Sequence, residues 1–152
     1  MSDALSSRAA RFAAAYALIR AAADVADHWV QTDHQARLKG QHDHTDGQSS
    51  AAGRRACAAH VATYTATQAG ALLLGSRVLG MRLRPGPMAA ALTLSAVTHY
   101  VADRREPLRR LADATGKSNF VRLSDHGMNG AYALDQAWHH AFETAAALIA
   151  AA

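Results

Sequence analysis

The chain has 152 residues, enough for one ordinary domain with a single core but not for two. Half of its residues are apolar and alanine dominates them, which favours closely packed helices. The single cysteine excludes an intramolecular disulfide, and the net charge of +4 favours anionic partners. We therefore predict an all-α fold, a compact bundle of four main helices in one domain, 1–152, with two polar irregular loops.

The first predicted helix covers residues 4–37 and carries the first polar cluster. Its early apolar run ends at Arg20, which is too short for a secretion signal, so we expect a cytoplasmic protein, with association to a membrane as the open alternative. Four polar residues then fall within an arc of about 100° on a helical wheel. They are Asp24, Asp27, His28 and Gln31. Because the other faces of this helix already carry charges, the cluster is not needed for solubility, and we favour a functional interpretation.

Residues 40–53 are polar and rich in glycine and serine, and their hydrophobicity shows no period. This composition predicts a mobile loop that is dispensable for folding. His42 and His44 lie inside it, and such a pair with neighbouring carboxylates binds metal weakly. We favour the interpretation of a solvated loop.

The second predicted helix covers residues 54–78 and has no formal charge between Arg55 and Arg77. It is as long as a bilayer-spanning helix, but alanine and threonine make up much of it, so a buried central helix is the better interpretation. His60 shares a helix face with Tyr64 and Gln68. Cys57 is expected to be a small buried thiol rather than a ligand.

The third predicted helix follows Pro85-Gly86-Pro87 and runs through residues 88–105. Near its end, His99 and Asp103 form an i, i+4 pair on one face. An unpaired ionised carboxylate is costly to bury in so apolar a helix, and a metal ion or a cationic histidine would remove that cost. Arg104 and Arg105 follow directly, where they would bind substrate oxygens or simply complement the helix dipole.

Residues 114–130 form a second irregular connection, and residues 131–152 a fourth helix. The Gly116-Lys117-Ser118 tripeptide lacks the upstream glycine and the preceding strand of a phosphate-binding loop, so it carries little weight. In the fourth helix, Asp135 and His139 repeat the four-residue spacing of a carboxylate and a histidine. Glu143 extends this row, whereas His140 faces away.

Helical bundles build metal centres from such pairs on facing helices, so we expect the clusters to converge. The predicted metal ligands are His28, His60, His99, Asp103, Asp135 and His139. Mixed nitrogen and oxygen ligands suit Zn²⁺, Mn²⁺ or Fe²⁺ better than Ca²⁺, and one or two ions are compatible with their number.

The polar clusters also resemble the motifs of a known family. These motifs are Asp27-x-x-x-Gln31-Thr32-Asp33, His60, Thr98-His99-Tyr100-x-x-Asp103 and Asp135-Gln136-x-x-His139. They resemble those of domain of unknown function 3307, a family of small helical proteins of bacteria and phages, many of them predicted membrane proteins. The chain departs from that pattern at Ala23-Asp24, where the family has a histidine, so we expect Asp24 or His28 to take its role.

A weaker resemblance concerns the pairs His99/Asp103 and His139/Glu143. Their spacing is similar to that of the pairs that hold zinc in membrane-associated metal-dependent hydrolases and in zinc phospholipase C-like bundles. This resemblance implies hydrolysis of a phosphoester, by analogy.

The leading hypothesis is a metal-dependent hydrolase of phosphoester or phosphoanhydride bonds, acting on a small phosphorylated substrate or a nucleotide. One of Asp24, Asp27 or Asp135 would take the proton from water. The residues expected to bind the substrate are Gln31, Arg104, Arg105 and Gln136. The alternative is a non-enzymatic helical module with a structural His/Asp network and a basic surface for nucleic acid or an anionic membrane. Metal sensing or storage is a third hypothesis.

Overall fold

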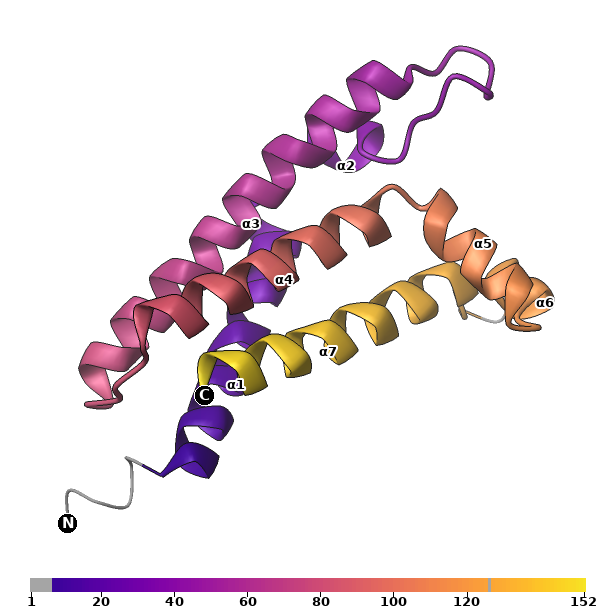
Figure 1. Ribbon diagram of the computed structural model, residues 1–152. Coiled ribbons are helices and arrows are strands. Elements are labelled where there is room, and N and C mark those ends of the chain that lie inside the picture. Colours follow the sequence, from indigo (N-terminus) through magenta and orange to yellow (C-terminus); the bar gives the residue numbers. More distant parts are fainter. Residues whose placement is uncertain (1–6, 126) are drawn as a thin grey trace.

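The computed structural model describes residues 7–125 and 127–152, and within these ranges the protein is helical without a strand (Figure 1). This confirms the predicted all-α class. The elements in chain order are α1 (Arg8–Val25), the π-helical turn η2 (Ala26–Val30), α2 (Asp33–Leu38), α3 (Ser50–Val78), α4 (Pro85–Asp103), α5 (Glu106–Ala114), α6 (Ser118–Val121) and α7 (Gly130–Ala150).

Four long helices form the bundle, in agreement with the prediction. Helix α1 packs against α3 and α7, and α4 packs against the same two helices, so the four enclose one core (Figure 1). Alanine supplies most of the buried core, and Ile19 and Leu72 are its large buried side chains. At Gly75 of α3 an added Cβ would lie 2.4 Å from Leu18 Cδ1, so the small residue permits the close approach of α1.

The prediction of one continuous first helix over residues 4–37 is wrong. Helix α1 ends at Val25 and continues as one wide turn, in which the Gln31 amide donates to the Ala26 carbonyl at 2.9 Å. A new helix then begins, because Thr32 and Gln35 form a reciprocal capping box. The Ser7 side chain caps the start of α1, and residues 4–6 lie outside the described residues.

The remaining boundaries also differ from the prediction. Helix α3 begins at Ser50, capped by Ser49, so the last residues of the predicted 40–53 loop are helical. Helix α4 ends at Asp103, before a turn in which Arg105 adopts a positive φ of 59°. Two short helices that the sequence did not predict, α5 and α6, lie beyond this turn and pack against α7 (Figure 1). Among the described residues, no helix has the length and apolarity needed to cross a membrane.

Candidate metal centre

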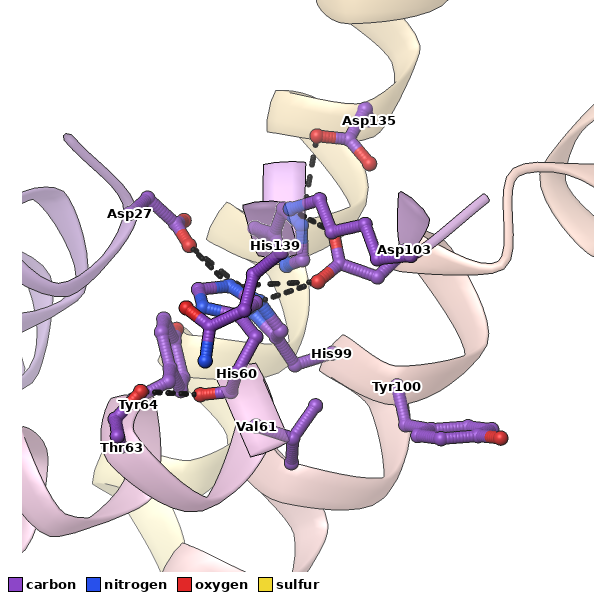
Figure 2. Close-up of polar contacts among 12 residues, drawn as sticks. Asp27, His60, Val61, Thr63, Tyr64, His99, Tyr100, Asp103, Asp135 and His139 are labelled. Carbon is purple, nitrogen blue, oxygen red and sulfur yellow. Dashed lines mark hydrogen bonds and ion pairs between the residues drawn. The ribbon is translucent and has the colours of Figure 1, made fainter. Parts of the chain in front are cut away.

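The polar residues of four elements meet where α3, α4 and α7 pass beside η2. His60 comes from α3, His99 and Asp103 from α4, and His139 from α7, and all four side chains are buried. Asp27, from η2, is half-buried and points toward the same centre (Figure 2). The i, i+4 spacing aligns these groups because side chains four apart lie above one another on a helix.

Four ligand atoms of this group lie close together. His60 Nε2 lies 3.0 Å from His99 Nε2, 3.0 Å from Asp27 Oδ1 and 3.4 Å from Asp103 Oδ2. His99 Nε2 lies 3.4 Å from Asp27 Oδ1 and 3.1 Å from Asp103 Oδ2. Tetrahedral ligands at the usual zinc distances are about 3.3 Å apart. The ligand atoms of Asp27, His60 and His99 all lie within 4.8 Å of one another, so these three residues could hold one ion, with Asp103 beside both imidazoles.

The protons of the two imidazole rings are too few to give every polar atom of this cluster a hydrogen bond. A neutral imidazole carries one ring proton, yet His60 Nε2 and His99 Nε2 each face the other ring and two carboxylate oxygens. Asp103 Oδ2 is buried and makes no hydrogen bond with adequate geometry, although the two imidazoles lie close to it. A buried carboxylate oxygen without a donor is unfavourable. A cation bound by these groups would supply the positive charge that the ring protons do not.

The charge state of both carboxylates suits metal binding. Burial by itself would raise the pKa of Asp103, but the neighbouring His99 imidazole and the Lys39 ammonium lower it well below its usual range. Burial likewise opposes ionisation of Asp27, and His60, His99 and His139 lower its pKa. Both groups are therefore carboxylates at neutral pH, the form in which they bind metals.

A second group of ligand atoms adjoins the first. One atom from each of His99, Asp103 and His139 lies within 4.8 Å of the others. Asp135 Oδ2 lies 3.5 Å from His139 Nε2. Burial by itself would lower the pKa of His139, but the contact with Asp135 raises it above its usual value. The groups Asp27–His60–His99 and His99–Asp103–His139 share His99, and each could hold a metal ion.

Beneath the cluster, a buried hydrogen-bond network holds the ring of Tyr64 against His99. The two ring centroids are 3.8 Å apart, and the Tyr64 hydroxyl donates to Glu143 Oε1 at 2.9 Å. Arg20 pairs with Glu143 at 2.5 Å, and Gln68 donates to the Tyr64 hydroxyl at 3.1 Å. Glu143 therefore belongs to this supporting network and not to the ligand set.

The two central histidines lack a hydrogen bond that histidines bound to a metal usually make. The Nδ1 atoms of His60 and His99 are buried and have no hydrogen-bond partner among the described residues. A ligating imidazole is commonly oriented by a hydrogen bond at its second nitrogen. In this protein, His99 is instead held by packing against two rings. Its ring centroid lies 3.8 Å from that of Tyr64 and 4.4 Å from that of His139.

Two predicted residues lie outside the cluster. The Asp24 side chain is 56% exposed and pairs with Arg20 at 2.9 Å. His28 is exposed and belongs to neither ligand group, although it lines the adjoining cavity. The wheel for a regular α-helix predicted that both would face inward with Asp27. His28 lies within the wide π turn, which changes the angle between successive residues, whereas Asp24 precedes that turn in regular α1 and is held outside by its ion pair with Arg20.

The cavity beside the cluster measures about 510 Å³, within the range of small-molecule sites. Three of the four predicted substrate-binding residues line it, namely Gln31, Arg105 and Gln136. The fourth, Arg104, does not. It is 6% exposed, and its guanidinium donates to the carbonyl groups of Lys39 and Gln41, at 2.6 Å each. Its role is thus structural.

The same contacts revise the interpretation of residues 40–53. Besides the bonds from Arg104, the His42 ring donates to the Arg104 carbonyl at 2.9 Å, and Asp43 exchanges hydrogen bonds with Ser50. This segment is therefore attached to the bundle rather than independent of it. His42, His44 and Glu106 could also group around an ion, but the Arg104 guanidinium, 3.2 Å from His42 Nδ1, disfavours a cation there.

Sequence reasoning missed two cations of the site, Lys39 and Arg109. Lys39 Nζ lies 2.7 Å from Asp103 Oδ1, and both residues line the cavity. Nothing in the sequence placed Lys39 at the site, because the predicted first helix ends at residue 37 and a mobile loop was expected to begin at residue 40. Arg109 lies on α5, which was not predicted because Pro107 was interpreted as the end of a helix rather than as part of its first turn. The strong amphipathicity of residues 106–114 could have indicated this helix.

The cysteine behaves as predicted from its position. Cys57 is buried, and its thiol donates weakly to the Tyr100 carbonyl at 3.7 Å. Burial, together with Asp103, raises the pKa of Cys57 to about 12. Cys57 also belongs to none of the groups of potential ligand atoms among the described residues.

No family model, curated protein or solved structure matches the chain. The resemblance to domain of unknown function 3307 therefore stays a prediction, and the case for function depends on the site itself.

Proposed function

We propose that this protein is a metal-dependent hydrolase of phosphoester or phosphoanhydride bonds. One observation carries the proposal: carboxylate oxygens of Asp27 and Asp103 each lie 3.0–3.4 Å from the Nε2 atoms of His60 and His99, and this cluster adjoins a cavity large enough for a small molecule. Their mixed nitrogen and oxygen chemistry favours Zn²⁺, Mn²⁺ or Fe²⁺, as one ion or, with His139, as two.

The chain supplies the remaining groups that hydrolysis requires. A divalent cation in the cluster would activate water and neutralise charge on the phosphoryl oxygens. We assign Asp135 to accept the proton from that water, because its side chain is 29% exposed, lines the cavity and lies outside the four-atom set. Asp24, which is exposed and paired with Arg20, no longer qualifies, and Asp27 is assigned as a ligand.

The non-enzymatic alternative treats the buried His/Asp network as purely structural. The Arg20–Glu143–Tyr64 network does fit that description, since its members satisfy one another. Asp103 Oδ2 does not, because it is buried and makes no hydrogen bond of adequate geometry, whereas a structural network normally satisfies its buried oxygens. This contrast favours the metal centre.

The test is turnover by protein purified without an affinity tag. We expect hydrolysis of a phosphomonoester, a phosphodiester or a nucleoside triphosphate that a chelator abolishes and added Zn²⁺ or Mn²⁺ restores. His99→Ala should eliminate turnover, whereas His140→Ala, at an exposed position, should not. Thermal unfolding measured beside activity separates loss of the site from loss of the fold, and Asp103→Asn keeps the side-chain shape if His99→Ala unfolds. Chelator-resistant turnover, or full activity in folded His99→Ala, would contradict the proposal.

A further inference from the structure

Three cationic residues line the cavity beside the cluster. They are Lys39, Arg105 and Arg109, and Asp27, Asp103 and Asp135 line the same cavity. Lys39 is paired with Asp103, but in the part of the chain that the structure describes neither Arg105 nor Arg109 forms an ion pair with a carboxylate. Two guanidinium groups that line a cavity and form no ion pair with a carboxylate favour an anionic ligand.

The backbone holds Arg105 in an unusual conformation at this position. Its φ of 59° is rare for a residue with a side chain. Its side chain crosses Gly40 so closely that a Cβ there would lie 2.4 Å from Arg105 Cδ, and Nη2 donates to the Ala36 carbonyl at 3.2 Å. The glycine and the turn together fix the path of Arg105 beside the cavity.

The cavity lining also includes a neutral hydrogen-bond donor, the side chain of Gln31. Its amide nitrogen is buried with no hydrogen-bond partner among the described residues. A buried amide nitrogen without an acceptor is unfavourable, and a phosphoryl oxygen in the cavity would accept its hydrogen bond.

Apolar groups occupy the rest of the lining. Leu108 of α5, Val121 of α6 and Leu134 of α7 line the cavity, and the ring of Tyr132 lies beside them. Inorganic phosphate would leave this apolar side in contact with water. An ester with one organic group would cover it and gain the corresponding burial energy.

We infer, on the basis of the proposed hydrolase function, that the substrate is a phosphomonoester of an apolar or aromatic alcohol. Its phosphate lies against Arg105, Arg109 and the Gln31 amide, and its organic group lies on the side formed by Leu108, Val121 and Leu134. The guanidinium groups of Arg105 and Arg109, neither of them in an ion pair with a carboxylate, match the two charges of a monoester dianion. In the reaction, water forms the new bond to phosphorus, the ester P–O bond breaks, and the alcohol leaves with a proton as inorganic phosphate is released.

Calorimetric binding of phenyl phosphate, inorganic phosphate and diphenyl phosphate tests this inference, with Zn²⁺-treated and with chelator-treated protein. We expect phenyl phosphate to bind wild type about tenfold more tightly than either other ligand. Arg109→Gln, and Gly40→Ala, which displaces Arg105, should each weaken phenyl phosphate by about tenfold, the effect of one charge-assisted hydrogen bond. Arg110→Gln is the matched control, since that side chain is on the same helix but 78% exposed and outside the cavity lining, and it should leave binding unchanged.

The outcomes separate this inference from the proposal on which it rests. Equal binding of phenyl phosphate and inorganic phosphate, tighter binding of diphenyl phosphate, or no loss in Arg109→Gln would overturn the monoester assignment even if the protein binds metal. If instead the protein binds no metal but discriminates among the ligands and responds to Arg109→Gln, the anion site stands and the hydrolase proposal fails.

Discussion

Replacing Arg104 with alanine should destabilise the protein strongly, because this guanidinium joins the end of α4 to the segment before α3. Its two hydrogen bonds to the carbonyl groups of Lys39 and Gln41 measure 2.6 Å each, and the residue is 6% exposed. A hydrogen bond to a charged group contributes about 1.5–3 kcal/mol. Water would reach part of the vacated space, so we expect the free energy of unfolding to fall by about 3 kcal/mol.

Thermal and urea unfolding of the metal-free protein would measure this loss without a contribution from bound metal. For a chain of this length, about 3 kcal/mol corresponds to a fall in Tm of roughly 6–12 °C. Arg110→Ala is the control, since its exposed ion pair with Glu106 should contribute no more than about 1 kcal/mol. If Arg104→Ala lost no more than this control, residues 40–53 would be an independent solvated loop and our interpretation of Arg104 would be refuted.

Three further predictions follow from the buried residues. The Cys57 thiol, with its pKa raised to about 12, should resist iodoacetamide at neutral pH in the native protein and react once urea unfolds it; labelling of the native thiol would show that this end of α3 opens. Gly75→Val should lower the free energy of unfolding by about 1–3 kcal/mol because the new side chain overlaps Leu18, and an unchanged urea midpoint would contradict that contact. Tyr64→Phe should lose about 1–3 kcal/mol by leaving Glu143 without its hydroxyl donor, while the retained ring keeps Zn²⁺ affinity near that of wild type; titration and urea unfolding measure the two effects separately.

Periodicity predicted the parts of the site that regular helices position. His60, His99, Asp103 and His139 lie on long helices, and a side chain's direction there follows from its place in the helical repeat. The composition likewise predicted the all-α bundle, because alanine-rich stretches without charges have few alternatives to buried helices.

The parts that periodicity missed depend on contacts between distant residues. The π turn that directs Asp27 inward and leaves His28 exposed interrupts the helical repeat on which the wheel was based. Lys39 reaches Asp103 only because Arg104 holds the neighbouring backbone, a contact across more than sixty residues. No local pattern contains that information.

Equilibrium binding of Zn²⁺ by untagged protein, measured by competition with a chromophoric chelator, tests the metal centre most directly. Wild type should bind at least one ion, Asp103→Asn should weaken binding at least about tenfold by removing a buried ligand, and His140→Ala should bind as wild type does. Unfolding curves of the metal-free variants would verify that all three proteins are folded. Failure of folded wild type to bind Zn²⁺, Mn²⁺ or Fe²⁺, or equal affinity in Asp103→Asn, would contradict the existence of this centre.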